Sequence, residues 1–387
     1  MTGDHPHRSA RHELAQPWRG VVASVAVIAV ALLAILPWDY ATLGGVVADV
    51  MMCAIPFAVV VGSFWHSAEP NGIGRLRQPW KGLAYLGLAA VVAVVVHVVL
   101  AATIGGGRGD TPVLAFGIIL SVVITFWLAV VWGGWPFTLI ANRVLGGLVL
   151  LATAYVVTAI VLRTLSFAFL GSGPAVAGLD PAGPVPAWDG LVFAVTCLAV
   201  IFGLLHFDLW PLTLIPGVMW QPVLGLVWSL ATLLVGGAAY LLGTRVLGMS
   251  PDTFMVTVPV PFMFGTVVLL TMLDGSLTTR LTGPVKGLVS AGLAAVIGTG
   301  LARLYVALMP VLTPDVPAPT AAAGALDQHL WLATALLAVT FPLLAMYKDF
   351  FGLWPLARGA EQIAAAPDRA DPPPTADLSE SQPVHTG

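Results

Sequence analysis

Three ionisable residues lie inside apolar stretches of the sequence, where an acid, a base and a cation could act on a ligand. Asp49, His97 and Arg303 each stand about six to eight residues from the nearest end of such a stretch. At the helical rise of 1.5 Å per residue, all three are expected roughly 10 Å below one membrane surface. Ionisable side chains at such depth usually face the bundle interior or a water-filled cavity. They predict a proton relay or a site for a charged ligand, unless Arg303 merely reaches the headgroups and His97 bonds a carbonyl.

The residues that follow Asp49 suggest a weaker, second kind of site. Met52, Cys53 and Pro56 stand at i+3, i+4 and i+7, so they share its helix face. Pro56 leaves the carbonyl one turn earlier without its donor. A carboxylate, a thioether, a thiol and this carbonyl could contact a soft metal ion such as copper. Met and Cys are also ordinary packing residues, so core packing is the simpler interpretation.

Polar residues also lie at or just beyond the ends of alternate apolar stretches, at His66, His206, Asp208 and Asp349. Helix ends and loop caps in interfacial water explain most of them. The functional hypothesis is a gate or metal site at the inner face that uses His66, His206 and Asp208. His206 and Asp208 are two residues apart, which is not a same-face spacing in a helix. Both could act together only from an unwound helix end.

Haem b is a further hypothesis, raised by four histidines near the predicted membrane. They lie in four different apolar stretches, at His66, His97, His206 and His329. A bis-histidine haem in a bundle usually takes its ligands from a facing pair of helices, which makes haem the less favoured interpretation. Copper or haem would belong to an alternative function, described below.

The composition requires a lipid environment for all of these residues. Hydrophobic residues make up 58% of the chain and charged residues 9%, whereas soluble domains carry roughly 25% charged residues. A bilayer core takes about 20 apolar helical residues to cross. Ten stretches qualify, at roughly 21–38, 41–65, 82–104, 112–134, 145–168, 189–208, 221–243, 253–273, 286–309 and 329–347. The fold class is therefore an all-α, polytopic membrane helix bundle of about ten transmembrane helices.

Three segments divide the chain. Residues 19–358 form the transmembrane domain, between an N-terminal tail at 1–18 and a Pro-, Ala- and Asp-rich C-terminal tail at 359–387. The C-terminal tail cannot bury a core and is expected to be disordered. Twelve of the 16 lysines and arginines fall on one side of the membrane if the N-terminus is inside. The positive-inside rule then places both tails in the cytoplasm and the protein in the cytoplasmic membrane.

A short motif recurs between the apolar stretches. Gln16-Pro17-Trp18-Arg19-Gly20 returns as Gln78-Pro79-Trp80-Lys81-Gly82, and looser copies close at Gly146, Gly225 and Gly287. Proline is tolerated at a helix start, and Trp with Lys or Arg suits the headgroup layer. Successive copies are 62, 64, 79 and 62 residues apart, which leaves room for two helices in each step. The sequence therefore predicts repeated two-helix hairpins of one orientation.

The function class follows from the membrane domain and its polar residues. No Walker loop, dinucleotide fingerprint, zinc-protease motif or nucleophile elbow is present. We expect a transporter or permease for a small solute or ion, with Asp49, His97 and Arg303 on its pathway, and proton coupling is one form that this transport could take. The alternative is a membrane subunit or anchor of a metal- or haem-dependent redox complex. The lipid bilayer is the expected partner, the outer loops 172–188 and 310–326 could dock other subunits, and nucleic acid is not expected.

Overall fold

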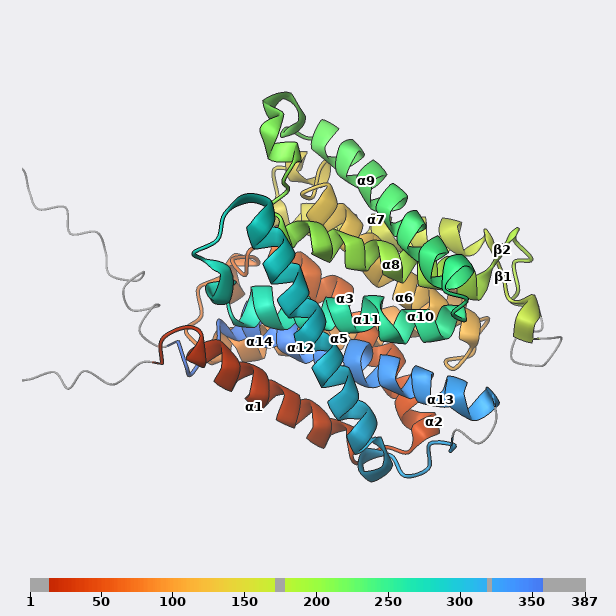
Figure 1. Ribbon diagram of the computed structural model, residues 1–387. Coiled ribbons are helices and arrows are strands. Elements are labelled where there is room, and N and C mark those ends of the chain that lie inside the picture. The colour runs from red at the N-terminus through yellow and green to blue at the C-terminus, as the bar shows by residue number, and fades with distance from the viewer. Residues whose placement is uncertain (1–13, 171–177, 319–321, 358–387) are drawn as a thin grey trace, which may run out of the picture.

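The computed structural model describes residues 14–170, 178–318 and 322–357. Most of the predicted N-terminal tail, the C-terminal tail at 359–387 and parts of both outer loops lie outside these residues. Within them, ten helical spans are long and apolar enough to cross a membrane. The predicted all-α membrane bundle is therefore confirmed (Figure 1).

The ten spans are numbered here in chain order. They run over Trp18–Ile35, Tyr40–Phe64, Trp80–Thr103, Pro112–Val131, Arg143–Leu162, Ala187–His206, Val223–Val246, Pro251–Met272, Gly283–Leu312 and Ala325–Phe351. The odd-numbered spans contain α1 (Trp18–Ile35), α5 (Trp80–Thr103), α7 (Arg143–Leu162), α9 (Val223–Leu241) and α12 (Gly283–Leu312). The even-numbered spans contain α2 (Tyr40–Thr42) and α3 (Ala48–Val59), α6 (Pro112–Phe126), α8 (Ala187–His206), α10 (Pro251–Thr257) and α11 (Pro259–Thr266), and α13 (Ala322–Ala333) and α14 (Phe341–Phe351). Between spans lie α4 (Asn71–Gly74) and a short parallel pair, β1 (Leu165–Ser166) with β2 (Val185–Pro186).

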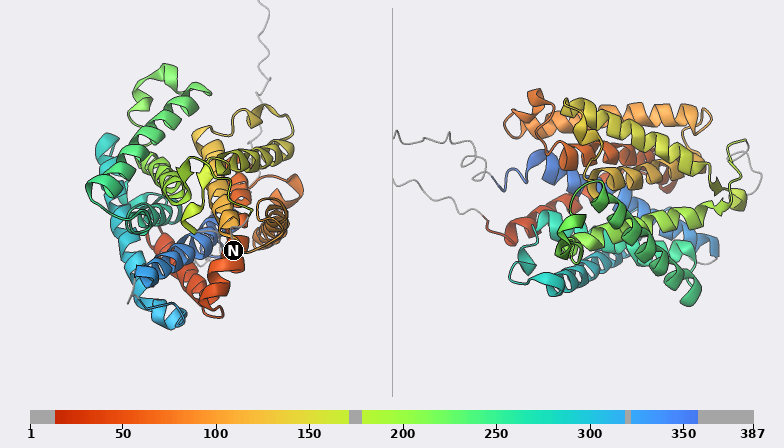
Figure 2. Two further views of the ribbon diagram at one scale, coloured as in Figure 1. Left: turned by 90° about the vertical axis from the view of Figure 1, so that its right-hand side faces the viewer. Right: turned by 90° about the horizontal axis from the view of Figure 1, so that it is seen from above.

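The even-numbered spans form an inner ring. Between 50% and 72% of each even-numbered span is buried, against 22% to 33% of each odd-numbered span. Each even-numbered span packs on the next one along the chain, and the tenth span closes the ring by packing on the second. Seen end-on, the bundle has these helices at its centre (Figure 2). The apolar surface that the odd-numbered helices leave uncovered suits contact with lipid.

Each odd-numbered helix lies in a groove between two inner spans. α5 packs on the second and tenth spans, α7 on the fourth and second, and α9 on the sixth and fourth. α12 packs on the eighth and sixth spans, and α1 on the tenth and eighth. Each outer helix therefore leads into one inner span but packs on the two inner spans that come before that span around the ring. The same offset holds for all five outer helices.

The recurrent Gln and Gly residues make the contacts that fix these grooves. The side-chain amide of Gln78 donates to the carbonyl of Phe350 at 2.7 Å and accepts from the amide of Gly82 at 3.2 Å. Gln16 and Gln221 bridge to the last turn of another inner span in the same way. A Cβ at each closing glycine would press against the end of an inner span; the pairs are Gly20 with Met272, Gly82 with Phe351, Gly146 with Phe64, Gly225 with Trp132, and Gly287 with Phe207. At Gly146 the added Cβ would lie still closer to the carbonyl oxygen of Phe137.

Four of the five inner spans are irregular, whereas among the outer spans only the seventh contains a wide turn, at Leu242–Val246. Wide helical turns with i→i+5 spacing occupy Val60–Phe64, Trp127–Val131, Val267–Met272 and Thr334–Thr340. The eighth span is also broken at Val258, where φ is −119° and ψ is −76°, directly before Pro259. Proline removes a donor from the helix ladder, and such breaks in membrane spans are tolerated inside a bundle or beside a cavity. Pro259 and Pro342 stand at helix starts, whereas Pro56 lies within α3.

The described chain begins and ends at the same end of the bundle (Figures 1 and 2). We call this end the terminal face. Inner spans run toward it, so their last residues, among them Phe64, Met272 and Phe351, lie there. An even number of spans requires this arrangement of the two chain ends.

Candidate functional site

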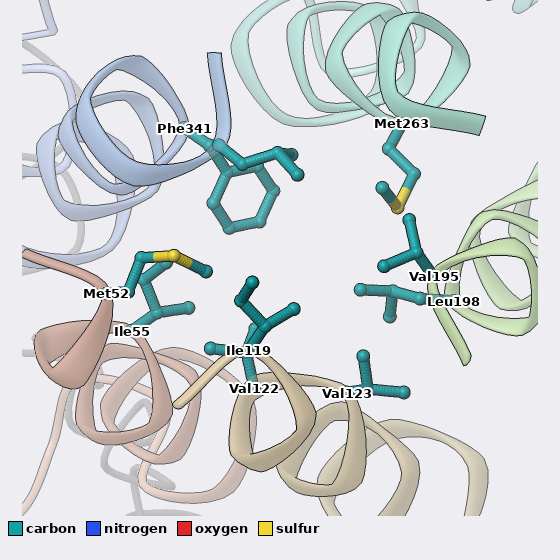
Figure 3. A pocket seen from close by; sticks show the side chains of 10 residues that line it. Met52, Ile55, Ile119, Val122, Val123, Val195, Leu198, Met263 and Phe341 are labelled. Carbon is teal, nitrogen blue, oxygen red and sulfur yellow. The ribbon is translucent and has the colours of Figure 1, made fainter. Parts of the chain in front are cut away.

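A small apolar cavity lies at the centre of the inner ring. Its volume is about 30 Å³, and all five even-numbered spans contribute to its lining. The lining side chains are Met52, Ile55, Ile119, Val122, Val123, Val195, Leu198, Met263, Leu337 and Phe341. Figure 3 shows them pointing inward from the surrounding helices. We call this space the central cavity.

A second cavity lies between the central cavity and the terminal face. It has a volume of about 250 Å³ and is also lined by residues of all five inner spans. Gly62, Thr271 and Asp349, each within two residues of the end of its span, belong to its lining. We call this space the vestibule. The two cavities share Ile55 and Phe341, so they follow one another along the ring axis.

Three phenylalanines separate the vestibule from the central cavity. The ring centroid of Phe126 lies 5.3 Å from that of Phe202 and 6.1 Å from that of Phe341, and the last two are 6.4 Å apart. They come from the fourth, sixth and tenth spans, and each is at most 9% exposed. Aromatic pairs at these distances attract one another. A cluster of rings from three different helices therefore lines the vestibule, and Phe341 places it where the two cavities meet.

The polar groups on the axis are confined to the vestibule. Among the described residues, the vestibule is lined by the carboxylate of Asp349 and by the hydroxyl residues Ser63, Thr266 and Thr271. No other charged residue belongs to the described lining of either axial cavity. The axis therefore offers one carboxylate and several hydroxyls on one side of the phenylalanine cluster, and only apolar side chains on the other.

Asp49 and His97 lie on neighbouring helices beside the axis. Asp49 is 5% exposed on α3, which packs closely on α5, the helix that carries His97. The Nδ1 atom of His97 is buried without a hydrogen-bond partner among the described residues, and its Nε2 atom faces Gly109. Neither residue lines the central cavity or the vestibule. The structure thus brings two of the three predicted pathway residues to adjacent helices.

Arg303, the third predicted residue, occupies a different part of the bundle. It is exposed on α12, which packs on α8 and α11, whereas Asp49 and His97 belong to the pair α3 and α5. An exposed arginine near a helix end can extend its guanidinium to the headgroups along its own aliphatic stem. A shared site with Asp49 remains a prediction.

Met52 and Cys53 point to different surroundings despite their adjacent positions. Met52 lines the central cavity, whereas Cys53 is buried near Tyr155 of α7. Across the part of the chain that the structure describes, no three His, Cys, Asp or Glu side chains gather as a metal-ligand set. The copper hypothesis therefore has no preformed cluster of these ligands to build on, and it stays a prediction.

The three residues of the predicted inner-face gate have three separate environments. His206 is buried, with Nδ1 2.7 Å from the hydroxyl of Ser290 and Nε2 2.9 Å from that of Thr266. These contacts tie α8 to α12 and α11, so both ring nitrogens are engaged in holding the bundle together. An iron ligand at His206 would have to break one of them.

Asp208 and His66 lie elsewhere on the terminal face. Asp208 is exposed and pairs with Lys286 at 2.5 Å. His66 lines a further cavity of about 130 Å³ together with Arg143, and this cavity shares Ser63 with the vestibule. Exposed ion pairs stabilise a fold by roughly 0–1 kcal/mol, which suits a surface contact at the start of α12. Parts of the two predicted docking loops lie outside the described residues, so their role stays a prediction as well.

The residues on the axis are largely ones that sequence reasoning overlooked. Asp349 was interpretable only as a helix-end residue, and Phe126, Phe202 and Phe341 looked like ordinary apolar residues. One signal was present: Phe341 directly precedes Pro342, a break in an inner span. Comparison with protein-family models, with curated proteins and with solved structures finds no match for this chain. The function must therefore be argued from the geometry alone.

Proposed function

We propose that this protein lets a small solute or ion cross a membrane along the axis of its inner ring. One observation carries the proposal: two successive cavities lie on that axis, and all five inner spans line each of them. Packing that served stability alone would fill the centre of a ring with interdigitating side chains. Irregular turns in the inner spans add support, because broken backbone in membrane proteins typically lines cavities.

The phenylalanine cluster gives this pathway a closed state. Water and ions leave narrow apolar constrictions, and channels use such dewetting as a gate. Phe126, Phe202 and Phe341 form this constriction next to a central cavity of only about 30 Å³. Opening then requires the rings to turn aside or the inner spans to move apart.

We further propose that the chain consists of five related two-helix hairpins in a cytoplasmic membrane, with both termini inside. The five closing glycines support the repeat, because each meets the end of an inner span at an equivalent place. The uniform offset between outer helices and grooves supports it too. Basic residues such as Lys81, Arg143 and Lys286 begin outer helices at the terminal face, as expected for the cytoplasmic side.

Thiol labelling tests the axial pathway without knowledge of the substrate. Cys53 and Cys197 are first replaced by alanine, and Ala345→Cys then places a thiol in the vestibule. Leu86→Cys is the matched control: it lies six residues into α5, at similar depth, and its side chain is 38% exposed toward the surroundings. A charged, water-soluble thiol reagent is expected to label Ala345→Cys in proteoliposomes and to leave Leu86→Cys unlabelled. Equal labelling of the two positions would contradict a water-filled vestibule.

Asp49 and His97 enter the proposal as residues for proton coupling beside the axis. Asp49 is buried on α3, and the Nδ1 atom of His97 on α5 is buried without a hydrogen-bond partner among the described residues. Carboxylates and imidazoles in such places are commonly part of proton relays. Asp49→Asn is expected to abolish proton-coupled uptake while the protein still elutes as a single folded species in detergent. Uptake at the normal rate would remove Asp49 from the mechanism.

A further inference from the structure

The vestibule contains one unpaired negative charge. The side chain of Asp349 has no hydrogen bond or ion pair with any described residue, although its backbone carbonyl accepts from the hydroxyl of Ser67 at 2.5 Å. The ammonium of its neighbour Lys348 forms its ion pair with Asp274, at 2.7 Å. A carboxylate that leaves water is costly without a compensating partner. The charge of Asp349 is therefore available to whatever occupies the vestibule.

A glycine on the facing helix makes room for this carboxylate. A Cβ at Gly62 would overlap the Oδ2 atom of Asp349, so the carboxylate lies directly against the backbone of the second span. Gly62 belongs to the wide turn Val60–Phe64 and lines the vestibule itself. Any larger residue at position 62 would push the carboxylate away from its position.

The other polar atoms in the vestibule are also oxygens. Ser63 and Thr271 line it with hydroxyls that make no hydrogen bond to another described residue, while the hydroxyl of Thr266 is engaged by His206. Carboxylate, hydroxyl and water oxygens are the ligands that hard cations prefer. An ammonium group can donate hydrogen bonds to the same oxygens. An anion would meet a fixed negative charge here and no cationic side chain of the described lining.

We propose that Asp349, with Ser63 and Thr271, forms a cation-binding site in the vestibule and makes the axial pathway select cations over anions. This inference rests on the proposed function, because selectivity has meaning only if the axis conducts. Carboxylates that line a pore favour cations by the same electrostatics in other channels. The ligand class is a small inorganic cation or an organic ammonium ion.

Reversal potentials test this site in a background that conducts. Purified Phe341→Ala protein is placed in a planar bilayer under a KCl gradient, and the K⁺ to Cl⁻ permeability ratio is measured. Adding Asp349→Asn is expected to lower that ratio about tenfold, since one charge at close range is lost while the shape is kept. Adding Gly62→Ala keeps the charge but displaces it, so an intermediate ratio is expected. The matched control is Glu69→Gln, which removes a carboxylate near the terminal face that lines neither cavity.

The outcomes separate this inference from the proposed function. An unchanged ratio in Asp349→Asn, with clear currents in the Phe341→Ala background, overturns the cation site and leaves the axial pathway standing. A background that prefers Cl⁻ over K⁺ also overturns the site. If folded Phe341→Ala protein carries no current with either ion, the proposed function itself fails. An equal drop in the ratio with Glu69→Gln would show general surface charge and overturn the assignment to Asp349.

Discussion

Replacing Phe341 by alanine is expected to raise ion flux through the reconstituted protein by on the order of tenfold or more. Phe341 is the residue common to the phenylalanine cluster and to both axial cavities. Without its ring, the vestibule of about 250 Å³ opens into the central cavity. A wider and shorter apolar segment is easier to wet, and wetting is the step that limits conduction through such a constriction. The measurement is single-channel or liposome flux, with wild type beside it.

Phe116→Ala serves as the control for lost bulk. Phe116 is on α6, the helix that carries Phe126, and is 7% exposed, but its ring packs on Phe167 and Trp188 away from the axis. Its loss is expected to cost roughly 3–5 kcal/mol of stability and to leave flux unchanged. Flux in Phe341→Ala that equals wild type, in protein that runs as a single species, would mean that the ring axis is not the pathway.

The second large effect is expected on stability, at the contact between α11 and α12. A Cβ at Gly298 would overlap the carbonyl oxygen of Pro261 and lie 2.5 Å from its carbon. A Cβ at Gly265 would overlap the carbonyl oxygen of Ala294 in the same way. Both obstacles are backbone atoms, which cannot rotate away, so the helices would have to separate. Gly298→Ala is expected to lower the free energy of unfolding by about 3 kcal/mol or more.

Two glycines of the same helix provide the comparison. Gly292 and Gly300 have no atom within 4 Å of an added Cβ, and both lie inside α12. Alanine there is expected to stabilise the helix by roughly 0.5–1 kcal/mol, because glycine is the poorer helix former. Thermal unfolding in detergent, followed by tryptophan fluorescence, measures all three variants. Equal midpoints for Gly298→Ala and Gly292→Ala would contradict the close backbone contact.

The spans themselves could be predicted because lipid imposes one simple demand. A span requires about 20 apolar residues whatever its neighbours are, and all ten predicted stretches begin within four residues of the observed span. The ninth helix runs longer than expected, from Gly283 to Leu312 instead of 286–309. Pro310 does not end it, because the helix continues through this proline into its last turn. The fifth ends sooner, at Leu162, where the chain turns into β1.

The division into inner and outer helices could not be predicted in the same way. In water, a buried face is apolar and an exposed face is polar, but in lipid both faces are apolar. α5 and α6 are similarly hydrophobic in sequence, yet α6 lies in the inner ring and α5 outside it. The residues of the vestibule could not be predicted for the same reason. Asp349 faces the vestibule only because Gly62, distant in the sequence, lets its carboxylate approach the backbone.

The offset between outer helices and grooves has a consequence for biosynthesis. Among the described helices α1 is synthesised before the others, but it packs between the eighth and tenth spans, which are synthesised much later. The groove that holds α5 is likewise incomplete until α14 has been synthesised. The first hairpin must therefore remain in the bilayer with its flank exposed to lipid until the ring closes around the last helix. Truncation anywhere before α14 leaves the earliest helices without their final neighbours, so this bundle matures only as a whole.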